Sequence, residues 1–333
     1  MILNKRTLTL VCALTAWLPS MSSTAAPSQV PMFLGGSVEP NVMFTLDDSG
    51  SMQWEMMPDS LVWSYFLYPR ASQIYGSNDY TNYTVSFTQS NNRYDKWVRS
   101  SAINTIYYNP AIQYRPWAKA DGSLMPNASP TCAYHNPANT VKGCRNLKTN
   151  NTQSANWEYY TDNATLANVG TNTNYVYEGY VSRTFWPSLY YNFTGDLSST
   201  ASKDNPTNYT RVEIKSSVSS YNGSANRTDC AAVPNCTYDE EIQNFANWYT
   251  YYRSRILLAR AGVGRAFAEQ GTGLRVGFGS INKGSTSIDG VSSPGAMIKG
   301  VRKFEGSDRT AFFASLYDHA ILTSGTPLRR ALD

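Results

Sequence analysis

The stretch Asn41–Leu46, with the sequence NVMFTL, leads directly into the polar loop Asp47–Ser51, with the sequence DDSGS. The first stretch is mostly apolar and follows glycine and proline residues, which predicts a buried β-strand that ends at the loop. Within the loop, Asp47, Ser49 and Ser51 occupy alternate positions. An extended backbone therefore turns these three side chains to the same side.

The oxygen atoms of this loop suit a hard divalent cation, because Mg²⁺ and Ca²⁺ prefer all-oxygen coordination. Thr326 offers a further hydroxyl in a second polar loop, Gly325–Leu328 (GTPL), although a threonine there is also typical of a helix N-cap. Open α/β sheets bind ligands beyond the carboxyl ends of their parallel strands. We therefore expect a cation site, with Mg²⁺ as the first choice and Ca²⁺ or Mn²⁺ as alternatives, formed by Asp47, Ser49, Ser51 and Thr326.

The middle of the chain, from about Met56 to Cys236, shows little helical periodicity. Turn-forming residues recur there, and segments rich in Tyr, Thr and Val between them, such as Val176–Val181 and Tyr209–Ile214, predict strands. A long irregular loop is the alternative, but loops of this length are rare in compact proteins. We expect a strand-rich inserted domain.

The clearest helical pattern covers Glu240–Glu269, where apolar residues recur every three or four positions. A strand is predicted over Leu274–Phe278, and a second helix over Ala311–Leu322, capped by Ser307 or Asp308. A strand, a loop, an insertion, a helix and a strand in this order predict an α/β sheet whose first crossover carries the insertion.

A further helix is predicted to begin at Leu328, and the chain reaches Asp333 within its first turns. We therefore expect the chain to be the N-terminal part of a longer protein. The expected domains are a signal peptide at 1–25, the first strand and cation loop at 33–55, the strand-rich insertion at 56–237 and the continued α/β domain at 238–333.

The first 25 residues are typical of a secretory signal. The basic residues Lys5 and Arg6 precede a short apolar stretch, Leu8–Leu18, and the small residues Ser23–Ala25 suit cleavage. A short membrane anchor is the alternative, and no later apolar run is long enough to span a membrane. Removing this segment lowers the formal net charge from +4 to +2, and without a basic stripe we expect no nucleic-acid partner.

Four cysteines follow the signal segment, and four cysteines allow three pairings. We expect Cys132 to pair with Cys144 and Cys230 with Cys236, because short loops cost least to close. A metal site that includes His135 is the alternative, but no Cys-x-x-Cys pair supports it.

Neither histidine, His135 or His319, lies beside a serine or cysteine motif, and each is predicted to be a surface or hydrogen-bonded side chain. Asp48 should point away from Asp47 and either support the ligands or lie in solvent. No catalytic motif is present, so we predict no enzyme, with a metal-dependent hydrolase as a remote alternative. Core packing explains most of seven aromatic residues that would otherwise form a sugar- or protein-binding face: Trp54, Trp63, Tyr107, Tyr108, Trp117, Trp157 and Trp186.

The stretch Phe44–Met52 (FTLDDSGSM), together with Gly325–Leu328, resembles the von Willebrand factor A domain and its metal-ion-dependent adhesion site, MIDAS. In that family the first aspartate and both serines bind the ion, and the threonine approaches it directly or through water. The resemblance implies a von Willebrand A-like, Rossmann-type sheet that is incomplete at the C-terminus. The family's second aspartate is expected to lie beyond Asp333.

A narrower resemblance covers most of the chain. It is similar to the N-terminal half of the PilY family, the pilus-tip proteins of type IV pili, in the segments Thr105–Pro110, Tyr114–Trp117, Asn208–Ile214, Gln243–Tyr249 and Arg253–Arg260. The resemblance implies an adhesin and biogenesis factor that is exported to the periplasm and then displayed at the pilus tip or cell surface. The family continues into a C-terminal β-propeller with a calcium loop, which this sequence does not contain.

Together these features predict a pilus-associated protein that binds its partners through a divalent cation. The expected partners are minor pilins at the pilus tip and a host or abiotic surface ligand. The alternative is a structural docking module of the pilus tip whose cation site is vestigial or purely structural.

Overall fold

The computed structural model describes residues 38–76, 83–87, 92–160, 164–169, 171, 175–282, 286–288, 291–293 and 297–332. The described residues from Pro40 onward form one compact unit. The predicted signal peptide, residues 1–25, lies outside the described residues. Within the described part of the chain, no helix combines the length and the apolar character needed to cross a membrane.

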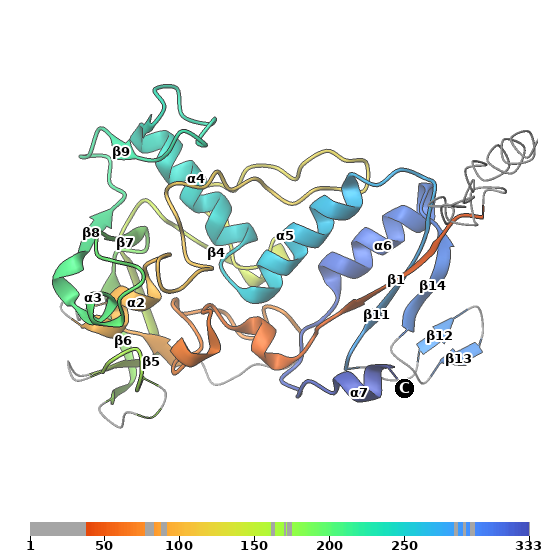
Figure 1. The fold of residues 1–333 in the computed structure, drawn as a ribbon, viewed down its shortest axis with the longest axis horizontal. Coiled ribbons are helices and arrows are strands. Elements are labelled where there is room, and N and C mark those ends of the chain that lie inside the picture. Colours follow the sequence, from red (N-terminus) through yellow and green to blue (C-terminus); the bar gives the residue numbers. More distant parts are fainter. Residues whose placement is uncertain are drawn as a thin grey trace, which may run out of the picture. The chain divides into compact units, whose positions relative to one another are not determined.

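The fold is mixed α/β, as predicted, and its central sheet has the strand order β1-β11-β14. The predicted first strand is present as β1 (Asn41–Leu46), and it pairs in parallel with β11 (Arg275–Ser280). β14 (Met297–Lys303) pairs with β11 in the antiparallel direction. Parallel strands require a long crossover, and here it is the chain from residue 47 to residue 274. Figure 1 shows β1 and β11 side by side, although their colours lie far apart on the bar.

The prediction of a single helix over Glu240–Glu269 is wrong, because the structure contains two helices, α4 (Tyr238–Tyr251) and α5 (Arg255–Ala268). Tyr252 leaves the helical backbone at φ −137°, and the hydroxyl of Ser254 then accepts a hydrogen bond from a backbone N–H in the first turn of α5. A new N-cap of this kind starts a new helix. The apolar periodicity continues across the break, so periodicity alone does not detect it.

The next helix, α6 (Gly306–Asp318), begins and ends earlier than the predicted Ala311–Leu322. Ser307 and Asp308, the two predicted caps, lie inside its first turn, and the side chain of the N-cap residue, Glu305, makes no capping hydrogen bond. The predicted helix after the second polar loop is present as α7 (Leu328–Leu332).

Aromatic side chains of α5 and α6 cover one face of the central sheet. The ring of Phe44 on β1 lies 5.8 Å from that of Phe267 on α5 and 6.1 Å from that of Phe312 on α6. The prediction that β1 is buried is nevertheless wrong for much of its length, since Val42 is 36% and Met43 is 40% exposed. Among the described residues β1 has a neighbouring strand on one side only, which explains this exposure.

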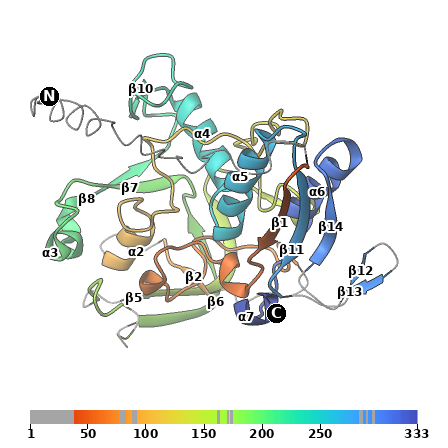
Figure 2. The same cartoon turned by 45° about the vertical axis from the view of Figure 1, so that its right-hand side comes forward.

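The region between η2 (Gly50–Gln53) and α4 contains the predicted strands, with Val176–Val181 inside β6 and Tyr209–Ile214 closely matching β8. The sheets of this region have the strand orders β2-β5-β6, β7-β8, β3-β4 and β10-β9. Figure 2 shows β5 and β6 as long antiparallel strands. The elements of this region are η3 (Asp59–Leu61), β2 (Tyr83–Val85), α2 (Arg93–Val98), β3 (Ala133–Tyr134), η4 (Thr140–Lys142), β4 (Cys144–Arg145), β5 (Asn151–Tyr160), β6 (Tyr175–Phe185), β7 (Leu189–Phe193), α3 (Thr200–Asp204), η5 (Pro206–Asn208), β8 (Tyr209–Glu213), β9 (Tyr221–Asn222) and β10 (Asn235–Cys236). A separate hairpin, β12 (Thr286–Ile288) with β13 (Val291–Ser293), precedes β14.

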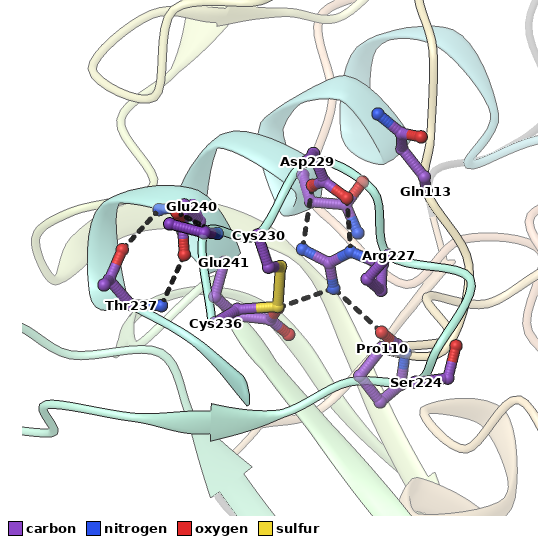
Figure 3. The surroundings of a disulfide bond; sticks show 12 residues. Pro110, Gln113, Ser224, Arg227, Asp229, Cys230, Cys236, Thr237, Glu240 and Glu241 are labelled. Atoms are coloured by element: carbon purple, nitrogen blue, oxygen red, sulfur yellow. Dashed lines mark hydrogen bonds and ion pairs between the residues drawn. A yellow bond between two sulfur atoms is a disulfide. The ribbon is translucent and has the colours of Figure 1, made fainter. Parts of the chain in front are cut away.

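Both predicted disulfides are present and confirm local pairing, Cys132 with Cys144 and Cys230 with Cys236. The second one lies at the start of α4, where Thr237 follows directly and forms a capping box at the helix N-terminus (Figure 3). The disulfide therefore constrains the segment that leads into this helix.

Candidate metal site

The loop Asp47–Ser51 connects the carboxyl end of β1 to η2. The Ser49 backbone N–H donates a hydrogen bond to Asp47 Oδ1 at 2.9 Å. The hydroxyl oxygens of Ser49 and Ser51 lie 3.2 Å apart. Ser49 is buried, whereas Asp47 and Ser51 are partly exposed. Three of the four predicted ligands thus lie together on one short loop.

Two further loops meet this one. The Gly50 backbone N–H donates to the carbonyl of Ser324 at 2.9 Å. Asn282, which follows β11, donates from its side chain to the carbonyl of Gly325 at 2.7 Å and from its backbone to Asp48 Oδ1 at 2.8 Å. The ends of β1 and β11 and the loop between α6 and α7 therefore form one polar cluster.

Thr326, the fourth predicted ligand, belongs to the loop between α6 and α7, and its side chain is exposed. Its neighbours Ser324 and Gly325 bind the other two loops through their carbonyl groups. The structure thus brings the backbone of this loop to the Asp47–Ser51 loop. Within the described ranges, the Thr326 hydroxyl itself makes no hydrogen bond.

Asp48 lies inside the polar cluster rather than in solvent, with only 1% of its surface exposed. Its Oδ2 lies 2.9 Å from Nε2 of His319, and its backbone carbonyl accepts a hydrogen bond from Leu322 at 3.3 Å. The alternative that Asp48 is solvated is therefore wrong. It holds the neighbouring loops in place, and His319 is hydrogen-bonded, as predicted.

Sequence reasoning did not identify Asn282 as a member of this cluster or His319 as the partner of Asp48. Asn282 carried a usable signal, because it is a polar residue at the carboxyl end of a predicted strand, where ligand loops are expected. His319 carried none, since nothing in the sequence connects it to Asp48, which lies 271 positions away.

The spacing of the oxygen atoms in the loop can be compared with the spacing of ligands around a divalent cation. Mg²⁺ holds its oxygen ligands at about 2.0–2.1 Å, so two neighbouring ligands at right angles lie about 2.9 Å apart. Ca²⁺ holds its ligands at longer distances, and the same ligand–ligand separation then exceeds about 3.2 Å. The Ser49 and Ser51 hydroxyls lie 3.2 Å apart and form a hydrogen bond, and this distance is wider than the Mg²⁺ spacing and close to the lower limit of the Ca²⁺ spacing. The Asp47 hydrogen bond to Ser49 uses Oδ1, which leaves Oδ2 for an ion.

The charge of this set is low for a metal site. Among the described residues there is no group of three or more His, Cys, Asp or Glu side chains able to hold a metal ion. The candidate set instead combines one carboxylate with three hydroxyls, so a bound cation would keep much of its charge for an external anionic ligand.

His135, the residue considered for a cysteine–histidine metal site, is buried and 6% exposed. Its Nδ1 lies 2.9 Å from the Tyr249 hydroxyl, and the nearby cysteines are paired in a disulfide. Burial, reinforced by the charges of Arg253 and Arg145, lowers the pKa of His135 from 6.5 to about 2. The imidazole is therefore neutral and structural.

This low pKa predicts a loss of stability in mild acid. Below pH 6.5 the unfolded chain protonates His135 while the folded chain does not, so the free energy of unfolding falls by up to about 1.4 kcal/mol per pH unit. Between about pH 6.5 and pH 4.5, the native chain should lose about 2 kcal/mol more than the His135→Gln variant. Urea denaturation at each pH measures this difference, and identical pH profiles would contradict it.

The chain is similar to type IV pilus biogenesis factor PilY1 of Pseudomonas aeruginosa. For strain PAK the identity is 27% over 305 residues, which cover 92% of this chain and 21% of that protein. For strain PAO1 it is 27% over 314 residues, with the same coverage of each chain. No protein-family model and no solved structure matches this chain.

This similarity agrees with the resemblance to the PilY family that the sequence segments indicate. The chain spans about a fifth of the length of the PilY1 relatives that it matches.

Proposed function

We propose that this protein is a type IV pilus-associated adhesin and biogenesis factor that binds its partners through a divalent cation. The cation, Mg²⁺ in the first place, is held by Asp47, Ser49, Ser51 and Thr326. The observation that carries the proposal is the meeting of three loops at the carboxyl ends of the parallel strands β1 and β11. Ligand sites in open α/β sheets form at such ends.

The mixed sheet supports the fold that belongs to this proposal, a von Willebrand A-like domain interrupted after its first strand. In this division, residues 33–55 and 238–333 form the cation-binding domain and residues 56–237 the inserted domain. The parallel pairing of β1 with β11 across that insertion supports the division. Export through residues 1–25 to the periplasm and then to the pilus tip is part of the same proposal.

The chemistry of the site points to an acidic partner. One carboxylate neutralises half of the charge of a divalent cation, and hydroxyl ligands neutralise none. A carboxylate from a minor pilin or a surface ligand would complete the coordination, because hard cations favour charged oxygen ligands. The role proposed is therefore binding and not catalysis.

Calorimetry with Mg²⁺, Mn²⁺ and Ca²⁺ tests the proposal on the chain purified after export. We expect binding, and we expect Asp47→Ala to weaken it at least about tenfold, because the variant removes the sole carboxylate of the set. Asp121→Ala, which removes an exposed carboxylate from another loop, is the control and should leave the affinity unchanged. Equal affinities of the native chain and Asp47→Ala would reject this site.

One observation favours the alternative of a structural docking module. The Asp47 carboxylate already accepts a hydrogen bond from Ser49, so the loop has an internal partner without a cation. In that case calorimetry detects no binding, and full-length protein with Asp47→Ala still supports pilus assembly. Loss of assembly in that variant, with its fold intact, would favour the cation instead.

A further inference from the structure

A cleft of about 710 Å³ is lined mainly by residues of the inserted region, together with Trp54, which directly follows η2. Six aromatic side chains line it, from the segment after η2 and from β2 and β6: Trp54, Trp63, Tyr65, Tyr83, Tyr175 and Tyr177. Its volume falls within the range of about 300–1,000 Å³ that is typical of small-ligand sites. Most of the other aromatic residues considered for a binding face are buried in the core, as predicted: Tyr107, Tyr108, Trp117 and Trp157.

The rings of the cleft are held in fixed arrangements but are not fully covered. The ring of Trp63 lies 4.8 Å from that of Tyr175, and Trp54 stacks on Tyr65 at 5.4 Å. Tyr175 is 40% and Tyr177 is 51% exposed. A ligand in the cleft can therefore contact ring faces that the fold leaves open.

One wall of the cleft carries a buried carboxylate, Glu158 on β5, which is only 5% exposed. The Ser64 hydroxyl donates a hydrogen bond to its Oε1. Within the described parts of the chain, no lysine, arginine or histidine forms an ion pair with this carboxylate. Burial raises the pKa of Glu158 above its ordinary value, and the Ser64 hydrogen bond opposes this only in part.

A buried carboxylate without a cationic partner is costly, and proteins normally pair such a group. Here the group lies in an open cleft, where a ligand can supply the missing positive charge. Organic cations also bind to the faces of Trp and Tyr rings through cation–π attraction. A neutral sugar would use the rings but would leave the charge of Glu158 uncompensated.

We propose that this cleft binds an organic ammonium group, with its positive charge beside Glu158 and its alkyl carbons against the rings of Trp63 and Tyr175. Asp59, which also lines the cleft, is already paired with Arg255 at 2.6 Å. It therefore adds little net charge, and Glu158 determines the preference for a cation. The proposal is independent of the cation at Asp47.

Choline is the first probe, titrated by calorimetry in the presence of EDTA so that divalent cations play no part. We expect millimolar binding, and we expect Glu158→Gln to weaken it at least about tenfold, since the variant keeps the shape of the side chain and removes its charge. Glu178→Gln is the matched control on β6, because that carboxylate pairs with Arg183 and does not line the cleft. It should bind choline as the native chain does.

Two further measurements keep the test decisive if Glu158→Gln folds poorly. Tyr175→Leu alters a ring that is already 40% exposed, and it should weaken choline binding severalfold while the far-ultraviolet circular dichroism stays unchanged. The uncharged carbon isostere of choline should not bind measurably. Equal binding of the isostere, no binding of choline, or unchanged binding in a folded Glu158→Gln variant would each overturn the proposal.

The source of the ammonium group is distinguished by two additional ligands. Phosphatidylcholine vesicles present it as a lipid headgroup, and a short peptide presents it as a lysine side chain, with the acetylated peptide as the uncharged control. Binding of one and not the other identifies the source. Equal binding of the free and the acetylated peptide, with no vesicle binding, would contradict a requirement for the charge.

Discussion

Replacing Arg253 with methionine should lower the free energy of unfolding by about 3–5 kcal/mol. Arg253 is 1% exposed, and its Nε donates to Glu55 Oε1 at 3.0 Å. Its two other nitrogens donate to the carbonyl groups of Tyr249 and His135, each at 2.7 Å. Methionine keeps much of the apolar stem, but it leaves the buried Glu55 without its cation and two carbonyl groups without a donor.

Urea denaturation of the native chain and Arg253→Met measures this loss. The double variant Arg253→Met, Glu55→Gln should recover part of it, because the uncompensated charge has then been removed. Arg183→Met is the matched control, since that arginine pairs with Glu178 while its own side chain is 41% exposed, and it should cost less than about 1 kcal/mol. A loss in Arg253→Met no larger than in this control would show that the buried pair contributes little.

The second large effect is expected for Arg227→Met, also at about 3–5 kcal/mol. Figure 3 shows the Arg227 guanidinium beside the Cys230–Cys236 disulfide, facing Asp229 and the carbonyl of Pro110. Its Nη1 lies 2.8 Å from Glu241 Oε2, and both side chains are fully buried. Burial raises the pKa of Glu241, and Arg227 opposes that effect by stabilising the charged form. Without the arginine, the Tyr108 hydroxyl is the one partner that the described residues still offer to this carboxylate.

A double-mutant cycle with Glu241→Gln separates the ion pair from the other contacts of Arg227. We expect a coupling energy of about 1–3 kcal/mol between the two positions. Arg211→Met serves as the surface control, because Arg211 and its partner Glu213 are both partly exposed. Additive effects of the two buried substitutions would mean that Arg227 acts through Asp229 and Pro110 rather than through Glu241.

The sequence was sufficient to predict the parts of the fold that depend on local pattern. The apolar run at Asn41–Leu46 forms the predicted strand with the same bounds, and the polar residues after it form the expected loop. Short loop lengths were enough to predict both disulfides. These features depend on residues that are close together in the chain, and local rules describe such residues well.

The features that the sequence did not predict depend on distant residues. Arg253 lies in the break between α4 and α5, and its partner Glu55 lies 198 positions away. The contact of Asp48 with His319 also joins two distant segments. The exposure of Val42 depends on which strands flank β1, and an apolar residue type alone cannot specify that. In each case tertiary contacts overrode a local preference.

The crossover between β1 and β11 also determines when the polar cluster can form. β1 is synthesised early, but its partner strand and the loop that carries Thr326 emerge only after the whole insertion has been made. Pairing across so many residues carries a high loop-closure cost, so it follows the more local packing of the insertion. The cluster can therefore assemble only after the whole insertion has been synthesised, and the hydrogen bond between Gly50 and Ser324 cannot form before that point.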